Sequence, residues 1–281
     1  MVPPVAVTHA RGTTLLKWHR ARRTATDPPF TAQRIVEGLR AGASVEVDLR
    51  IHADRGFAVL HDHRLDRETT GRGAVAATPA ARLRTMALRD GTGKPSGHGV
   101  LLLEDLADLL ADAPLPRSAL LQLDYKQEAR DLDARSVAAF AAATAPIDEH
   151  LILSCGDADA VRILTDAAPG VAVGFDPCHR GAAGRALASG DFAGFVDRAC
   201  LASPRATTIY LEIPLVLGAA DAGFDLIGAF GARGRAVDAY TLGGAANVGM
   251  VPIVAGLLEL GVDQLTVDDP EGLLALLTDA D

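Results

Sequence analysis

The sequence predicts an α/β fold, a closed (β/α)8 or TIM barrel, as a single domain over residues 1–281. Short β-branched or apolar runs alternate with Ala/Leu-rich segments of helical length along the whole chain, which is typical of a parallel sheet. Eight such strand–helix units in a chain of this length favour closure into a barrel. No linker, repeat or low-complexity tract divides the chain. A doubly wound open sheet is the structural alternative.

The elements follow from local patterns. Strands are predicted where β-branched and apolar residues gather between turn signals, at 4–9, 44–50, 118–126, 150–155, 171–176, 207–213, 235–241 and 263–268. Helices are predicted where apolar residues recur with helical spacing, at 31–42, 104–112, 129–145, 157–167, 182–202, 215–230, 247–260 and 270–279.

The segment after the second strand departs from this alternation. A turn signal (ADRG, 53–56) and an alternating run (FAVLH, 57–61) predict a small extended insertion instead of a helix. Because barrel active sites are built by the loops that follow the strands, this insertion is a candidate part of the site.

Composition and charge limit the location and the partners that we expect for the protein. No apolar stretch of about 18 residues and no signal peptide is present, so we expect a cytoplasmic protein without integral membrane association. The net charge of −9 argues against a nucleic-acid partner. Residues 1–100 nevertheless hold 16 of the 27 Lys and Arg and six of the eight His, which suits a small anionic substrate.

Strand periodicity gathers three carboxylates. Glu46 and Asp48 share one face of the second strand, and Asp124 lies with Lys126 on one face of the third. Because helices cover the outside of a barrel, these charged faces should point inward to the mouth. Converging carboxylates are unfavourable unless a cation joins them, and oxygen-only ligands favour one Mg²⁺ or Ca²⁺ ion. A structural ring of salt bridges with Arg50 and Lys126 is the alternative.

Other candidates lie at predicted strand ends. His9 ends the first strand with Arg11 on the same face, and His61 ends the run in the insertion. Two imidazoles near one phosphate can act as base and acid, because imidazole titrates near neutral pH. Lys126 is one of only three lysines, and its compact ammonium suits a phosphate or a carboxylate. Glu212 ends the sixth strand and would be a further ligand or a partner for a substrate ammonium.

Six stretches of the chain resemble motifs of the glycerophosphodiester phosphodiesterases. In chain order they are HARG, VEVDLR, VLHDHRLDRETTGRG, LDYK, YT and GVDQLTVDDPE. The family pattern is an HRG start, an ExD strand, HDxxLxRTTxGxG, an ExK strand, a WT pair and GxDxxxTDxP. The resemblance spans nearly the whole chain, and its most specific part is the stretch VLHDHRLDRETTGRG. It implies a TIM barrel that hydrolyses a small phosphodiester with one divalent cation.

Carried over by position, the resemblance also implies roles. His9 and His61 would be the general acid and base. The metal ligands would be Glu46, Asp48 and Asp124. Arg11 and Lys126 would contact the phosphate. Tyr240 stands where the family has a tryptophan that packs on the alcohol of the substrate.

Several departures predict an altered substrate. An alanine separates His9 from Arg11, and PPFT at 28–31 replaces the family's PENT segment after a longer separation. Asp124 is shorter than the family's glutamate, and Tyr240 replaces the tryptophan. An intact HRG occurs at 179–181, after the fifth predicted strand. At that position we expect it to belong to the loop that leads into the next helix. The KWHRARR run at 17–23 would cap the substrate mouth, contact an anionic lipid surface or form a solvated helix or loop, and charge runs of this kind favour the last.

Three functions therefore stay open. The first is hydrolysis of a glycerophosphodiester to a phosphomonoester and an alcohol. The second is a lyase, similar to phospholipase D toxins, that stops at a cyclic phosphate. The third is a catalytically silent barrel that binds phosphate esters. The exact alcohol, the choice between Mg²⁺ and Ca²⁺ and the oligomeric state are not predicted.

Overall fold

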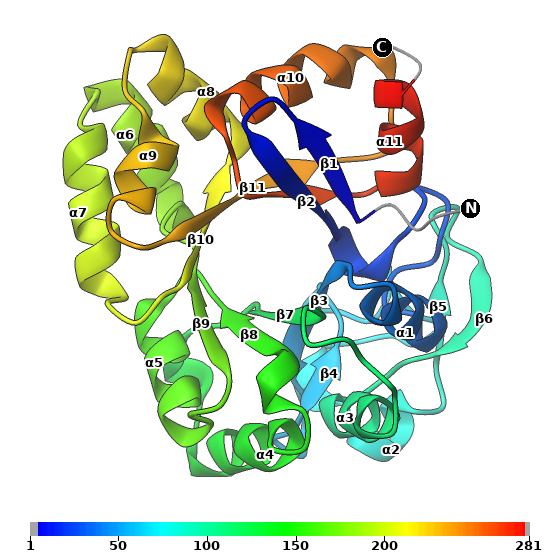
Figure 1. Ribbon diagram of the computed structural model, residues 1–281. Helices are drawn as coiled ribbons and strands as arrows, with labels where there is room; N and C mark the ends of the chain where they lie inside the picture. The colour runs from blue at the N-terminus through cyan, green and yellow to red at the C-terminus, as the bar shows by residue number, and fades with distance from the viewer. Residues whose placement is uncertain (1–4, 279–281) are drawn as a thin grey trace.

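A computed structural model describes residues 5–278, which form eight parallel strands closed into a barrel inside a ring of helices (Figure 1). The barrel strands are, in chain order, β2 (Gly12–Trp18), β3 (Ser44–Ile51), β7 (Leu120–Tyr125), β8 (Leu151–Ser154), β9 (Ala172–Phe175), β10 (Thr208–Glu212), β11 (Ala236–Leu242) and β12 (Gln264–Val267). Pairing of β2 with both β12 and β3 closes the circle. The predicted fold class is therefore confirmed.

Helices follow the barrel strands and cover their outer faces. They are α1 (Ala32–Arg40), α3 (Leu103–Ala111), α4 (Ala134–Thr144), α5 (Ala158–Ala167), α6 (Ala182–Ser189), α7 (Phe192–Ala202), α8 (Ile213–Asp221), α9 (Leu226–Gly231), α10 (Val251–Leu260) and α11 (Pro270–Thr278). The single helix predicted at 182–202 is wrong, because Gly190 ends α6 at φ 69° and Asp191 caps the start of α7. Among residues 5–278, no helix is long and apolar enough to span a bilayer.

The first barrel strand is not where the sequence predicted it. Residue 4 lies outside the described part of the chain, and residues 6–9 of the predicted 4–9 strand form β1 (Ala6–His9), the antiparallel partner of β2 in a hairpin. The barrel strand is β2, although it contains Lys17. Its outward Trp18 is fully buried and lies close to Gly38 of α1.

The insertion after the second barrel strand is confirmed. It contains β4 (Phe57–Val59), which pairs antiparallel with β3, the short helix α2 (Ala80–Leu83), and a hairpin of β5 (Ala87–Arg89) and β6 (Pro95–Gly99). Alternation along β3 sends Val45, Val47 and Leu49 outward into the helix-covered core, where all three are fully buried. The charged residues between them therefore face the barrel interior.

Candidate active site

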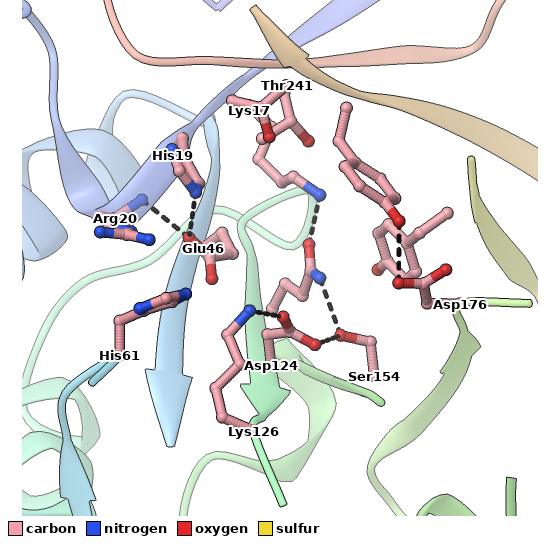
Figure 2. A pocket seen from close by; sticks show the side chains of 14 residues that line it. Lys17, His19, Arg20, Glu46, His61, Asp124, Lys126, Ser154, Asp176 and Thr241 are labelled. Carbon is pink, nitrogen blue, oxygen red and sulfur yellow. Dashed lines mark hydrogen bonds and ion pairs between the residues drawn. The ribbon is translucent and has the colours of Figure 1, made fainter. Parts of the chain in front are cut away.

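A cavity of about 260 Å³ opens at the carboxyl ends of the barrel strands (Figure 2). Its lining comprises Lys17, His19, Arg20, Glu46, His61, Gln122, Asp124, Lys126, Ser154, Asp176, Tyr210, Tyr240, Thr241 and Thr266. Most of these side chains are polar or charged. The mouth of a closed parallel barrel is where such side chains from several strands converge.

Three carboxylates meet in this mouth. Ligand oxygens of Glu46, Asp48 and Asp124 all lie within 4.8 Å of one another. Strand register explains the gathering, because Asp48 of β3 is the direct neighbour of Asp124 on β7. Lys126 lies between two of them, with Nζ 2.9 Å from Asp48 Oδ1 and paired with Asp124 Oδ2. The structure thus brings together the four residues that strand periodicity placed here.

The electrostatics of the carboxylates fit a divalent cation. Burial, followed by the charge of Asp48, raises the pKa of Glu46 well above its usual range. Burial also opposes ionisation of Asp48, but the charges of Lys126 and Arg20 hold its pKa below the usual range. Within residues 5–278, neither Asp48 oxygen has a hydrogen-bond partner of good geometry. Three converging carboxylates, of which Asp48 is held, among the described residues, only by the charges of Lys126 and Arg20, offer the oxygen donors that Mg²⁺ or Ca²⁺ prefers.

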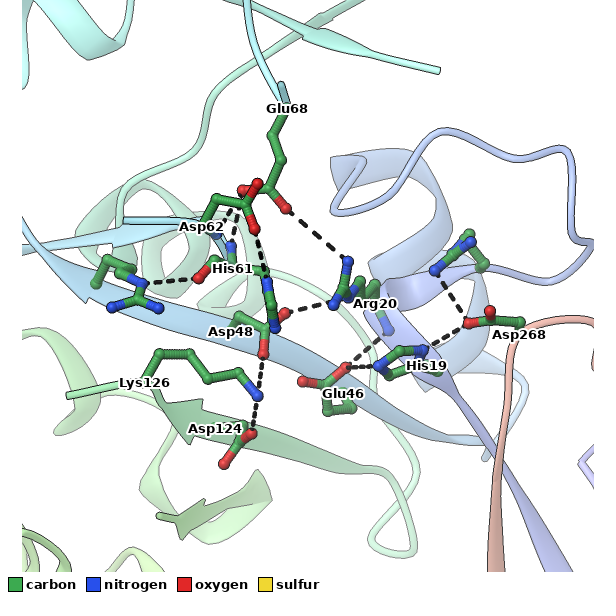
Figure 3. Close-up of polar contacts among 12 residues, drawn as sticks. His19, Arg20, Glu46, Asp48, His61, Asp62, Glu68, Asp124, Lys126 and Asp268 are labelled. Atoms are coloured by element: carbon green, nitrogen blue, oxygen red, sulfur yellow. Dashed lines mark hydrogen bonds and ion pairs between the residues drawn. The ribbon is translucent and has the colours of Figure 1, made fainter. Parts of the chain in front are cut away.

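His19 is a site residue that the sequence analysis missed. It follows β2 directly, in the 3₁₀ turn η1 (His19–Ala21). Its Nδ1 lies 2.5 Å from Asp268 Oδ1, and its Nε2 lies 3.9 Å from Glu46 Oε2 (Figure 3). Burial lowers the pKa of His19, although Asp268 favours its charged form. The KWHRARR run therefore comprises the end of β2 and the turn that follows it, and Lys17, His19 and Arg20 line the cavity. Its interpretation as a solvated segment is wrong.

Arg20 is the second missed residue. Its backbone adopts a positive φ of 53°, and its N–H donates to Glu46 Oε2 at 2.7 Å. The guanidinium Nε lies 3.4 Å from Asp48 Oδ2. The carbonyl of Arg20 accepts a hydrogen bond from Phe30 N at 2.9 Å, which joins the PPFT segment to this turn.

His61 reaches the same mouth from the insertion. Its Nδ1 lies 2.9 Å from Asp62 Oδ1, and Arg67 donates two hydrogen bonds of 2.7 Å to that carboxylate. The buried Glu68 accepts hydrogen bonds from the backbone N–H groups of His61 and Asp62, at 3.1 and 2.8 Å. Burial lowers the pKa of His61. Glu68 was also missed, and it stands where the family motif has a threonine.

His9 and Arg11 do not reach the cavity, which corrects their predicted roles. His9 Nε2 lies 3.0 Å from Thr14 Oγ1, and Arg11 Nη1 donates to the Glu259 carbonyl at 2.6 Å. Both residues adjoin the first residue of β2, whereas the cavity lies at the opposite end of that strand, where Lys17 and His19 line it. A strand of this length spans about 20 Å.

Comparison with known proteins identifies the family. The model of the "Glycerophosphoryl diester phosphodiesterase family" matches residues 31–272. The chain belongs to this family. The match begins after His19 and Arg20, so those two residues join the site on structural grounds.

Individual relatives of the family are distant. A Mycobacterium tuberculosis protein described as "Probable glycerophosphodiester phosphodiesterase 1" is 34% identical over 96 residues. That alignment covers 32% of this chain and 35% of the relative, so the match spans about a third of the curated relative.

Solved structures of this family share the fold. An Agrobacterium tumefaciens glycerophosphodiester phosphodiesterase gives a TM-score of 0.66 at 19% identity, with 94% of this chain and 99% of that chain covered. An Oleispira antarctica phosphodiesterase in complex with the product sn-glycerol-3-phosphate gives 0.63 at 18% identity, with 94% and 96% covered.

Tyr240 also lines the cavity. Its hydroxyl donates to Asp176 Oδ2 at 2.9 Å, and burial raises the pKa of Asp176 to about 6. Glu212 pairs with Tyr240 in strand register, but it is not among the described residues that line the cavity. Asp176 was missed, since a single acid after a short strand carries no motif.

Proposed function

We propose that this chain is a metal-dependent phosphodiesterase that hydrolyses a glycerophosphodiester-type substrate to a phosphomonoester and an alcohol. The observation that carries the proposal is the meeting of three carboxylates with two imidazoles, those of His19 and His61, in one barrel mouth. Membership of the phosphodiesterase family supports the same reaction class.

The carboxylates of Glu46, Asp48 and Asp124 are the proposed ligands of one Mg²⁺ or Ca²⁺ ion. When bound, such an ion would neutralise charge on the phosphate and lower the pKa of an attacking hydroxyl or water. Lys126 and Arg20 lie beside the same carboxylates, and they would bind the remaining phosphate oxygens.

The two imidazoles are arranged for proton transfer. The Nδ1 atoms of His19 and His61 are engaged by Asp268 and Asp62, which leaves each Nε2 directed to the cleft (Figure 3). One Nε2 would accept the proton of the attacking oxygen, while the other would donate a proton to the departing alcohol oxygen. Tyr240 would contact the alcohol side of the substrate.

The reaction can be followed by ³¹P NMR with sn-glycero-3-phosphocholine, with and without EDTA. We expect a phosphomonoester signal that the chelator abolishes and that added Mg²⁺ or Ca²⁺ restores. No conversion of any glycerophosphodiester in the presence of either ion, or conversion unchanged by EDTA, would overturn the proposal. A cyclic phosphate that persists as the final product would also overturn it, in favour of the lyase.

A further inference from the structure

A chain of hydrogen bonds between buried side chains links β2, β7 and β8 and ends on Asp124. Lys17 Nζ donates to Gln122 Oε1, and Gln122 Nε2 donates to Ser154 Oγ at 2.8 Å. The Ser154 hydroxyl donates to Asp124 Oδ1 at 2.7 Å. Figure 2 shows this path from Lys17 to Ser154 and Asp124 along its dashed lines. Lys17, Gln122 and Ser154 are each no more than 5% exposed.

The chain starts at a buried ion pair. Lys17 Nζ lies 2.7 Å from Asp238 Oδ2 and 4.4 Å from the centre of the Tyr210 ring. Thr266 donates to the other oxygen of Asp238 at 2.6 Å. The ammonium is therefore held by residues of β10, β11 and β12 on one side and by Gln122 on the other. Because separating a buried ion pair is costly, Lys17 is a fixed donor at the start of the chain.

The chemistry of the groups fixes the direction of every bond in the chain. An ammonium only donates, so the Gln122 amide presents its oxygen to Lys17 and its nitrogen to Ser154. The amide nitrogen also only donates, so Ser154 Oγ accepts from it and directs its single proton to Asp124. The donor character of Lys17 is thus carried through two side chains to the carboxylate.

This bond gives the two oxygens of Asp124 different surroundings. Oδ1 accepts from Ser154, while Oδ2 pairs with Lys126, whose Nζ also lies 2.9 Å from Asp48 Oδ1. Oδ2 is therefore the oxygen on the side where the three carboxylates meet. A hydrogen bond to one oxygen of a metal-ligating carboxylate is the usual way in which a protein orients that ligand.

We propose that Ser154 and Gln122 are positioning residues for Asp124, that Lys17 orients both, and that together they set the affinity of the carboxylate site for its cation. This inference rests on the proposed function, since it takes Asp124 as a ligand. Ser154 and Gln122 also line the cavity, so the alternative is a direct contact with the substrate. A substrate contact would change KM and leave cation binding as it is.

Isothermal titration calorimetry of the EDTA-treated protein with Ca²⁺ and with Mg²⁺, without substrate, tests the inference. Loss of a hydrogen bond to a ligand typically costs about 10- to 100-fold in metal affinity, so Ser154→Ala should raise the Kd about tenfold. Gln122→Met leaves Ser154 without its donor and should raise the Kd by a smaller factor, about threefold. Added to Ser154→Ala, it should have no further effect, because Gln122 acts through Ser154.

Ser44→Ala is the matched control. It removes a buried serine hydroxyl that, within residues 5–278, has no hydrogen-bond partner, and it should keep the wild-type Kd. The melting temperature of each EDTA-treated variant checks that the barrel is folded. If Ser154→Ala does not fold, Gln122→Met decides the question alone.

The outcomes separate this inference from the proposed function. A wild-type Kd in Ser154→Ala or in Gln122→Met, or losses that add up in the double variant, overturns the positioning role and leaves the phosphodiesterase proposal standing. An equal rise of the Kd in Ser44→Ala overturns it as well. A wild-type protein that binds neither ion overturns the proposed cation site and this inference with it.

Discussion

Asp268 Oδ1 lies 2.5 Å from Nδ1 of His19, and the two residues directly follow the last and the first barrel strands. This contact fixes the ring of His19 with Nε2 toward Glu46. Arg22 also approaches Asp268, at 3.0 Å. Asp268→Asn should therefore lower kcat by about tenfold or more, because the amide no longer stabilises a protonated imidazole. Phosphodiester turnover measures this, and an unchanged kcat with an unchanged pH profile would contradict a positioning role.

The two histidines at opposite ends of β2 give a sharp comparison. His19→Ala should reduce kcat/KM by about 10²- to 10⁴-fold, the usual contribution of a general acid or base. His9→Ala removes an imidazole at the far end of the strand and should leave activity within twofold. Circular dichroism on both variants checks that the barrel is intact. Equal losses in the two variants would mean that the cleft is not the reaction site.

Cation binding has a readout apart from activity. An ion that binds the folded carboxylate site raises the melting temperature by mass action. We expect millimolar Mg²⁺ or Ca²⁺ to raise the Tm of the wild type, and Asp48→Asn to abolish the shift. Asp66→Asn changes an exposed carboxylate outside the site and should keep it. A shift that survives in Asp48→Asn would place the cation elsewhere.

His52 predicts a pH dependence of stability. It is only 2% exposed, and burial lowers its pKa, so the unfolded state binds the proton more readily. The free energy of unfolding should therefore fall as pH drops through about 6.5, the ordinary pKa of histidine. Urea unfolding at pH 7.5 and 5.5 should show a smaller loss in His52→Gln than in the wild type. His63→Gln, which removes an exposed imidazole, is the control, and identical losses in His52→Gln and the wild type would refute this account.

The contact between α1 and the barrel has no room for a methyl group at Gly38. A Cβ there would lie 2.7 Å from Val45 Cγ2 and 3.1 Å from Trp18 Cε3. Gly38→Ala should destabilise the protein by about 1–3 kcal/mol through overpacking. Gly184→Ala on α6 meets no atom within 4 Å and should stabilise by about 0.5–1 kcal/mol. Urea unfolding compares them, and an equal sign for both would reject the packing argument.

Sequence reasoning succeeded where local pattern and burial agree. Alternation along residues 44–50 predicted both the outward valines and the inward Glu46 and Asp48, since a barrel strand has one covered face. It failed at the first strand, because residues 5–9 are more apolar than β2 and nothing local says that they form a hairpin partner. If residues 4–9 form the barrel strand, as the sequence predicts, His9 occupies the place that His19 has in the structure. Asp268 pairs with His19 across 249 positions, a contact that no local pattern encodes.

The pairing of the first barrel strand, β2, with the last, β12, has a consequence for folding during synthesis. β2 pairs with β12, so His19 is synthesised 249 positions before Asp268, its partner across the closing pair of strands. A nascent polypeptide cannot form this contact before residue 268 has been synthesised. If His19 acts as proposed, activity requires closure of the barrel, and turnover would report the completion of folding more directly than helix content does.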